Sequence, residues 1–412
     1  MHGALARFGN TTFSSLKIRN YRLYYIGQVI STSGTFMQSL AQSWLVLQLT
    51  HSGTALGLVA AMQFVPVLFL GPYGGVIADR FPKRKLLLLT QSLYSILAIL
   101  LGLLVGTGLI QLWMVYIFAI SYGLITTVDN PVRQSFVVEM VGKDEVRNAV
   151  TLFSSLVNLA RVIGPSLAGV LIATVALEVC FILNGLSYVA VIIMLLMMRA
   201  SELYTPPPPS RTGSGILDGF QYVWATPVLR DVLVMMAIIG TLTFEFQVSL
   251  PLIAQFTFNG NAQAYAALTS AMGLGAVAGG LITASRKKVS GTMLVSAAFL
   301  FGAAVIFAAL MPNLLLAVLA MVVVGGFSIN FTSQGNSVLQ LESAAQMRGR
   351  VMALWAVAFL GSTTIGGPLI GWIAERSDPR WGLLVGGLAA MVASAYGFAT
   401  LRRLPPVTAP AK

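Results

Sequence analysis

Two ionisable side chains lie inside long apolar runs of the sequence. Glu245 is flanked by Phe244 and Phe246 in "LTFEFQVSLP", and Arg161 lies in "ARVIGPSLAG". A charge inside a lipid bilayer is costly unless it is paired or neutralised, so such residues are candidates for function. Glu245 is the first candidate for a proton carrier. The alternative is a neutral, hydrogen-bonded glutamate that only holds two helices together, or a glutamate that already lies in the outer headgroup zone.

A second acid, Asp129, lies four residues before Arg133 in "DNPVRQ". On a continuous helix this spacing allows the two side chains to pair. Pro131 lies between them and makes the continuation of the helix doubtful. Asp129 is the second candidate for proton coupling, and Arg133 is predicted to belong to a gate. The alternative is a solvated amphipathic turn.

The composition places these residues in a membrane protein. Of 412 residues 57% are apolar and only 9% charged, and the mean hydropathy is +0.83, whereas about a quarter of residues are charged in soluble domains. The apolar runs reach the roughly 20 residues of a membrane-spanning helix and do not alternate as barrel strands do. We predict an all-α integral membrane protein with twelve spans near residues 22–48, 54–78, 86–107, 111–130, 148–174, 179–198, 229–251, 263–285, 290–311, 313–338, 350–374 and 381–401.

The basic residues predict the orientation, because cytoplasmic links carry an excess of Lys and Arg. With the N-terminus inside, about 22 of the 25 basic residues fall on the cytoplasmic side. Both termini are then cytoplasmic. The same bias accounts for the net charge of +12 through contact with anionic lipid headgroups, so no nucleic-acid partner is expected.

A proline-rich segment divides the chain. Four consecutive prolines in "RASELYTPPPPSRTGSG" exclude a helix there. The following "ILDGFQYVWATPVLRD" has the pattern of a short amphipathic helix. The predicted division is a six-helix half over 1–198, a cytoplasmic linker over 199–227 and a second six-helix half over 228–412.

Two short patterns recur about 200 residues apart. "GGVIAD" at 74–79 returns as "GGLITA" at 279–284, and the pair Gly164-Pro165 returns as Gly367-Pro368. Repeats of this kind predict two six-helix repeats around a central cavity, an architecture of secondary transporters.

The link after the second span carries a more specific pattern, "GGVIADRFPKRK". It resembles the loop motif between helices two and three of the major facilitator superfamily, with Pro82 where that pattern has glycine. The resemblance implies a latch that holds the outward-facing state, with Asp79 as its acid. A simple positive-inside link is the alternative. The motif positions are Gly71, Gly75, Asp79, Arg80, Arg84 and Lys85.

"ARVIGPSLAG", at 160–169, resembles the helix-five motif of antiporter branches of the same superfamily. Gly164, Pro165 and Gly169 supply a bend and a smooth packing face. The resemblance implies a gating role for them and for Arg161. A proline kink needed only for packing is the alternative.

The segment at 129–150, together with "FILNGLSYVA" and "RGRVMALW", is similar to the branch that contains enterobactin exporters and macrolide-efflux pumps. This resemblance covers nearly the whole chain and implies the major facilitator fold. It also implies proton-coupled efflux of a drug-like or siderophore-like molecule.

Spans one, four, seven and ten line the cavity in this superfamily, which directs attention to their polar and aromatic side chains. Interhelical hydrogen bonding is the alternative role for each polar residue. The cavity candidates are Gln38, Gln42, Phe244, Asn330 and Gln334.

Several other chemistries are not expected. The sequence has one cysteine and two histidines, Cys180, His2 and His51, and no nucleotide-binding P-loop pattern. We therefore expect no metal, no cofactor and no enzyme activity. The interpretation is a secondary active transporter, monomeric, in a bacterial cytoplasmic membrane, with a small-molecule substrate, protons and membrane lipids as partners. A proton-independent solute or lysophospholipid carrier and a non-transporting membrane sensor remain open.

Overall fold

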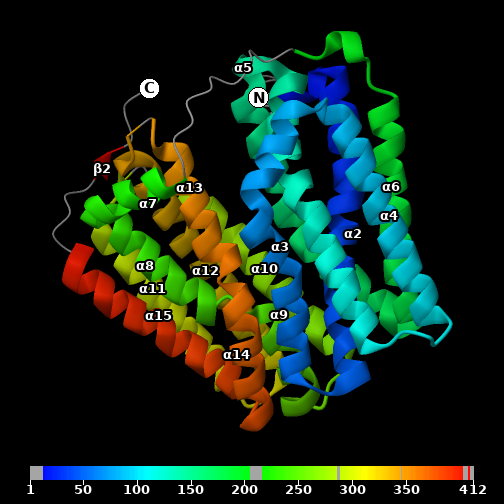
Figure 1. Cartoon of the computed structure of the whole chain (residues 1–412). Coiled ribbons are helices and arrows are strands. Elements are labelled where there is room, and N and C mark those ends of the chain that lie inside the picture. Colours follow the sequence, from blue (N-terminus) through cyan, green and yellow to red (C-terminus); the bar gives the residue numbers. More distant parts are fainter. Residues whose placement is uncertain (1–12, 205–215, 285–287, 345, 402–406, 409–412) are drawn as a thin grey trace, which may run out of the picture. The chain divides into compact units, whose positions relative to one another are not determined.

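The computed structural model describes residues 13–204, 216–284, 288–344, 346–401 and 407–408, and it is helical apart from two short strands (Figure 1). Ten helical segments in this part of the chain are long and apolar enough to cross a membrane. The predicted all-α membrane class is confirmed. Contacts between the elements define two compact units, unit 1 with residues 1–42 and 69–211 and unit 2 with residues 43–68 and 212–412.

Unit 1 contains most of the elements before residue 205. Two helices, α2 and α3, belong partly to each unit. Helices α2 and α3 pass from one unit to the other, α2 after Gln42 and α3 after Leu68. The elements are η1 (Ser14–Lys17), α2 (Arg19–Thr50), α3 (Gly53–Arg80), α4 (Lys83–Gly106), α5 (Leu112–Thr174), α6 (Leu177–Leu196) and η2 (Ala200–Glu202).

Close backbone approach holds the helices of unit 1 together. Helix α4 packs on α6, where Gly102 faces Phe181 and Gly185 faces Ile99. Helix α2 also packs on α6, with Gly34 against Asn184. Small residues at these contacts let the helix axes approach, which is the usual device between membrane helices.

Helix α5 differs from the prediction. The sequence predicted a link over 131–147, but the helix from Leu112 continues through Pro131 as far as Val141, and helical structure resumes after Gly142. The bend comes later, at Gly142, whose φ of 70° suits glycine because it has no Cβ. The expectation that Pro131 interrupts the helix between Asp129 and Arg133 was therefore wrong, and both residues lie on one helix.

Unit 2 contains the remaining elements. Helix α10 packs on α12 through Gly275 and Gly325, and α11 packs on α15 through Gly302 and Gly387 (Figure 1). The elements are α7 (Ile216–Ala225), α8 (Pro227–Leu242), α9 (Phe246–Leu252), η3 (Ile253–Thr257), α10 (Ala262–Ala284), β1 (Lys288–Val289), α11 (Gly291–Ala309), α12 (Leu314–Glu342), α13 (Arg348–Ala356), η4 (Val357–Gly361), α14 (Thr363–Arg376), α15 (Arg380–Leu401) and β2 (Val407–Thr408). Strands β1 and β2 pair antiparallel.

Helix α7 is the amphipathic helix predicted after the proline-rich segment. Its exposed side chains Phe220 and Trp224 stack at 5.3 Å between ring centroids. The prolines themselves fall in 205–215, outside the described residues.

Two of the membrane-spanning segments in unit 2 are interrupted. The segment Pro227–Thr257 breaks between α8 and α9 and ends in the π-helical turn η3, and the segment Arg348–Arg376 contains the π-helical turn η4. Breaks and π-turns in helices are frequent at functional positions. Glu245 lies at the first break, at the N-cap position of α9.

The first part of α3 packs on α14 within unit 2. Gly57 contacts the Gly367 backbone and Gly53 contacts the Gly371 backbone, so closely that a Cβ at any of these positions would overlap a carbonyl group. Beyond the glycines, Glu375 Oε2 accepts hydrogen bonds from Ser52 Oγ at 2.7 Å and from Thr54 N at 2.8 Å. The carboxylate thus caps the N-terminus of α3, where it suits the helix dipole.

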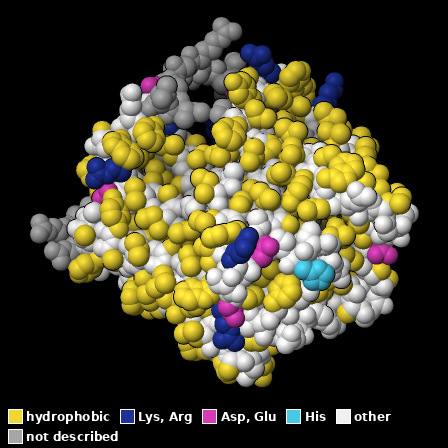
Figure 2. Space-filling model, turned by 60° about the horizontal axis from the view of Figure 1, so that its bottom comes forward, with side chains coloured by type: hydrophobic (Ala, Val, Ile, Leu, Met, Phe, Trp, Pro, Cys, Tyr) yellow, Lys and Arg dark blue, Asp and Glu magenta, His cyan; other side chains and the backbone are white. Residues whose placement is uncertain are grey.

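The outer surface is apolar, as a lipid-facing surface must be. Figure 2 shows one face of the molecule on which hydrophobic side chains predominate and charged side chains are few. Leu281, Phe69 and Leu315 are each at least two-thirds exposed. This surface and the buried polar residues described below are the reverse of a soluble protein's arrangement.

Candidate functional site

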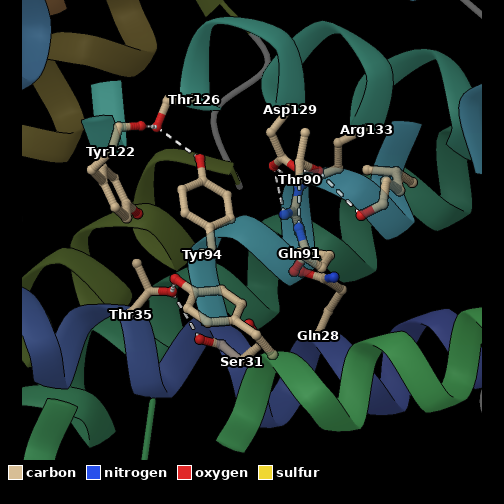
Figure 3. Close-up of polar contacts among 12 residues, drawn as sticks. Gln28, Ser31, Thr35, Thr90, Gln91, Tyr94, Tyr122, Thr126, Asp129 and Arg133 are labelled. Carbon is tan, nitrogen blue, oxygen red and sulfur yellow. Dashed lines mark hydrogen bonds and ion pairs between the residues drawn. The ribbon is translucent and has the colours of Figure 1, made fainter. Parts of the chain in front are cut away.

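Asp129 and Arg133 form a buried ion pair on α5. Arg133 Nη2 and Nε donate to Asp129 Oδ2 at 2.7 and 3.0 Å, and Arg133 Nη1 donates to Gln28 Oε1. The other carboxylate oxygen, Oδ1, accepts from Thr90 Oγ1 at 2.7 Å and from Gln91 Nε2 at 2.9 Å (Figure 3). Asp129 is 2% exposed, and each of its oxygens has two donors. The ion pair thus joins helices α2, α4 and α5.

Three tyrosines extend this polar cluster. Tyr94 stacks on Tyr188 at 5.2 Å between ring centroids and lies 4.8 Å from Tyr122. The Tyr94 hydroxyl hydrogen-bonds Thr126 Oγ1 at 2.8 Å, and the Tyr188 hydroxyl hydrogen-bonds Thr35 Oγ1 at 3.1 Å. The rings stand between α2, α4, α5 and α6, and Figure 3 shows Tyr94 and Tyr122 beside the ion pair.

The cluster surrounds a cavity of about 210 Å³ in unit 1. Its walls carry aromatic rings, hydroxyls and amides, and its two formal charges cancel. Such walls suit a polar aromatic group of a solute. The lining residues are Gln28, Ser31, Thr32, Thr35, Tyr94, Tyr122, Thr126, Asp129, Asn130, Arg133, Phe153 and Tyr188.

Glu245 in unit 2 has a very different setting. It is 3% exposed, and its Oε1 has no hydrogen-bond partner. The Thr363 side chain lies beside the carboxyl group. A methyl group on Gly366 would lie 2.8 Å from Oε1, so the carboxyl group packs on the backbone of α14. In the described part of the chain no cation pairs with it.

Other buried polar atoms of unit 2 also lack partners. Asn330 Oδ1 and Gln334 Oε1, both on α12, are buried without a hydrogen bond, whereas Phe244 packs in an aromatic cluster with Phe246, Phe301 and Phe359. Buried polar atoms without partners are costly and call for a functional explanation.

Two basic residues that follow α3 connect helices of unit 1. Lys83 Nζ pairs with Glu139 Oε1 at 2.8 Å, and Arg84 donates to the carbonyl oxygens of Leu195 and Leu196 at the end of α6. Asp79 and Arg80 are exposed. A Cβ on Gly75 would meet nothing within 4 Å, whereas the adjacent Gly74 packs against the carbonyl group of Thr127 on α5.

The helix-five motif packs on α2. Gly164 approaches the backbone of Ser33 and Met37 and the Phe36 side chain, while Pro165 and Gly169 are buried within α5. The Arg161 guanidinium lies over the Phe36 ring, with Cζ at 5.8 Å from its centroid.

The two glutamines predicted on the first span lie apart from the cavity of unit 1. Gln38 Oε1 accepts a hydrogen bond from Asn184 Nδ2 at 2.7 Å and so joins α2 to α6. Gln42 is partly buried and does not line this cavity.

Most partners of the ion pair were not predicted from the sequence. Thr90 and Gln91 are adjacent polar residues in an otherwise apolar helix, which was a usable signal. The residues on α2 follow the spacing of a helix face, at 28, 31, 32 and 35. Tyr94 and Tyr122 gave no signal by themselves, because tyrosine is common in membrane helices.

The sequence matches a known family over nearly its whole length. A family model described as "Transmembrane secretion effector" matches residues 10–411. The chain is 24% identical over 326 residues to the staphyloferrin A transporter of Staphylococcus aureus, covering 78% of this chain and 81% of that protein. It is 26% identical over 390 residues to the enterobactin exporter EntS of Citrobacter koseri, covering 90% and 91%.

Solved structures of transporters share the fold. A bacterial homologue of the human lysosomal transporter Spinster, in an inward-facing and unoccupied conformation, superposes with a TM-score of 0.72 at 15% identity, covering 92% of this chain and 97% of that chain. The nucleoside transporter NupG superposes with a TM-score of 0.72 at 12% identity, covering 92% and 98%. The protein is thus a multi-pass membrane transporter and not an enzyme, and it belongs to the transmembrane secretion effector family of the major facilitator superfamily.

Proposed function

We propose that the protein exports a siderophore-like or drug-like small molecule from a bacterial cytoplasm in exchange for protons. Two relatives carry names that state siderophore transport, staphyloferrin A in one and enterobactin in the other. The polar aromatic cavity of unit 1 is suited to part of such a solute. A monomer with both termini in the cytoplasm is part of the proposal.

The proposed architecture is twelve crossings in two six-helix repeats, 1–198 and 228–412, joined by a linker over 199–227. Helix α5 supports it, since the kink at Gly142 divides it into parts of 30 and 32 residues, and each part is long enough at 1.5 Å per residue for one crossing of a core of about 30 Å. The close pair α4 and α6 in unit 1 also has a counterpart in the pair α11 and α15 of unit 2.

The observation that carries the proton coupling is the setting of Glu245. A carboxyl group inside a membrane-spanning segment, with a free oxygen and no bonded cation among the described residues, can take up one proton and release it without breaking an ion pair. Asp129 is less suited to this role, because protonation would disrupt its bonds to Arg133.

In the proposed cycle Glu245 carries the proton. The outward-open state loads a proton on Glu245, the cavity turns inward, and the substrate then displaces the proton. The contact of α3 with α14 lies beside Glu245, since a methyl group on Gly367 would meet both Gly57 O at 2.9 Å and Glu245 Oε2 at 3.5 Å. Protonation of the carboxyl group therefore alters the contact between α3 and α14. In this cycle Asp79 and Arg80 latch the outward-facing state.

The test is accumulation of a siderophore or a fluorescent dye in inverted vesicles under an imposed pH gradient. We expect accumulation that requires the gradient and falls at least tenfold in Glu245→Gln. Asp144→Asn is the matched control, because Asp144 is an exposed acid on α5. Accumulation that survives Glu245→Gln contradicts the coupling role. Accumulation insensitive to the gradient favours a proton-independent solute or lysophospholipid carrier, and no turnover of any substrate favours a sensor.

A further inference from the structure

Arg161 is a cation in a membrane-spanning helix, and no carboxylate in the described part of the chain pairs with it. Arg133, a partly buried arginine on the same helix, is neutralised by Asp129. Arg161 is partly buried and lies on the face of α5 that packs on α2, because Gly164 one turn later contacts Ser33 and Phe36.

The contact with Phe36 does not satisfy this guanidinium. A cation over an aromatic ring gains about 0.5–2 kcal/mol, but holding an arginine at the centre of a bilayer costs about 2.5–3.5 kcal/mol even on the lower estimates. The ring also accepts none of the in-plane N–H donors, of which arginine has about five. A guanidinium in this position has donors to offer to a ligand.

The charges of unit 1 indicate the sign of that ligand. The cavity cluster of Asp129 and Arg133 is neutral, because the guanidinium pairs with the carboxylate through two hydrogen bonds. Arg161 therefore leaves the polar interior of this unit with one positive charge. An anion would neutralise it, whereas a cation would be repelled.

We propose that Arg161 binds the carboxylate, or another planar oxyanion, of the transported molecule, and that Phe36 contacts the apolar part beside that group. This inference rests on the proposed function, since it assigns the substrate class as amphipathic organic acids. Guanidinium is suited to the task because its fork pairs with two oxygens of one oxyanion. The loaded site is then neutral, which lowers the cost of closing it to water.

Binding to the purified full chain in detergent tests the inference without any gradient. Carboxyfluorescein and rhodamine 123 share the xanthene ring system but differ in charge, and fluorescence anisotropy gives the affinity for each. We expect at least tenfold tighter binding of the anionic dye. Arg161→Met should remove the preference for the anionic dye, and Arg161→Lys should retain part of it. Phe36→Leu should weaken the binding of both dyes a few-fold and leave the preference unchanged.

Arg147→Met is the matched control, because Arg147 is an exposed arginine on the same helix. The melting temperature of each variant separates misfolding from loss of binding, and Arg161→Lys keeps the test decisive if the methionine variant does not fold. Equal affinity for the two dyes, no binding of carboxyfluorescein, or a preference unchanged in Arg161→Met would each overturn the inference. Anion binding that persists while gradient-driven export fails would contradict the proposed function and leave this site standing.

Discussion

Asp129 in unit 1 and Glu245 in unit 2 are both deeply buried acids, and they are held in opposite ways. Asp129 in unit 1 accepts four hydrogen bonds, two of them from an arginine. Glu245 in unit 2 has one oxygen without a partner and packs on glycine backbone. We infer that Asp129 is a fixed charge that ties three helices together, and that Glu245 is the group free to exchange a proton.

The polar surroundings of the two acids follow the same division. Around Asp129 the hydroxyls of Tyr94 and Tyr188 are hydrogen-bonded. In unit 2, Asn330 and Gln334 have buried oxygens without partners. An unpaired buried polar atom costs about 1–3 kcal/mol. Gln91 Oε1 in unit 1 lacks a partner too, so the division holds for the hydroxyls around Asp129 and not for every polar atom of that unit.

The largest expected effect is the loss of stability in Asp129→Asn. The change leaves Arg133 as a buried charge without its counter-ion, and breaking a buried pair in this way costs about 3–5 kcal/mol. The free energy of unfolding in mixed micelles should fall by that amount. The double variant Asp129→Asn with Arg133→Gln removes both charges and should recover part of the loss. Equal losses in the single and double variants would show that the pair is not coupled.

The next effect tests the close backbone packing between α3 and α14 in unit 2. In Gly57→Ala the new methyl group would overlap the Gly367 carbonyl, so α3 and α14 must separate. Overpacking of this kind costs about 1–3 kcal/mol. Gly71→Ala is the control on the same helix, since its methyl group meets nothing within 4 Å. Alanine favours a helix more than glycine does, so Gly71→Ala should not lower the melting temperature. An equal fall in both variants would show that the contact with Gly367 is not the cause.

A smaller effect is expected at the end of the same contact. Glu375→Ala removes the acceptor for Ser52 Oγ and Thr54 N. Loss of a helix N-cap costs about 1 kcal/mol, and the melting temperature should fall accordingly. Glu375→Gln keeps an acceptor oxygen and should lose less. If alanine and glutamine variants melted together with the unaltered chain, the cap would have no energetic role.

The two acids also show which structural features can be predicted from the sequence. Apolar runs of about 20 residues predict the membrane helices, because length and composition suffice for that. The spacing of Asp129 and Arg133 was recognised, but the helix through Pro131 was not expected. Proline removes one backbone hydrogen bond, and packing of α5 in the bundle compensates for that loss. Local propensity cannot report such a contribution.

The residues that contact the two acids could not be predicted from residue spacing. Thr90 and Gln91 reach Asp129 from another helix, so their role depends on the rotation of α4 and α5 about their axes. The free oxygen of Glu245 depends on the break between α8 and α9 and on the backbone of Gly366. Residue spacing gives the faces of one helix, whereas these contacts are set by tertiary packing.

The smallest expected change in stability is at Glu245, and it sharpens the contrast with Asp129 most directly. Glu245→Gln keeps the size and the carbonyl oxygen of the side chain, and in the described chain no ion pair is lost. We expect the free energy of unfolding to stay within about 0.5 kcal/mol, as for substitutions that break no bonded network. Asp129→Asn, the equivalent change in unit 1, should cost several times more in the same assay. A loss at Glu245 as large as at Asp129 would mean that its carboxylate is held by a charge, and the proton-carrier assignment would then fail together with the contrast between the two units.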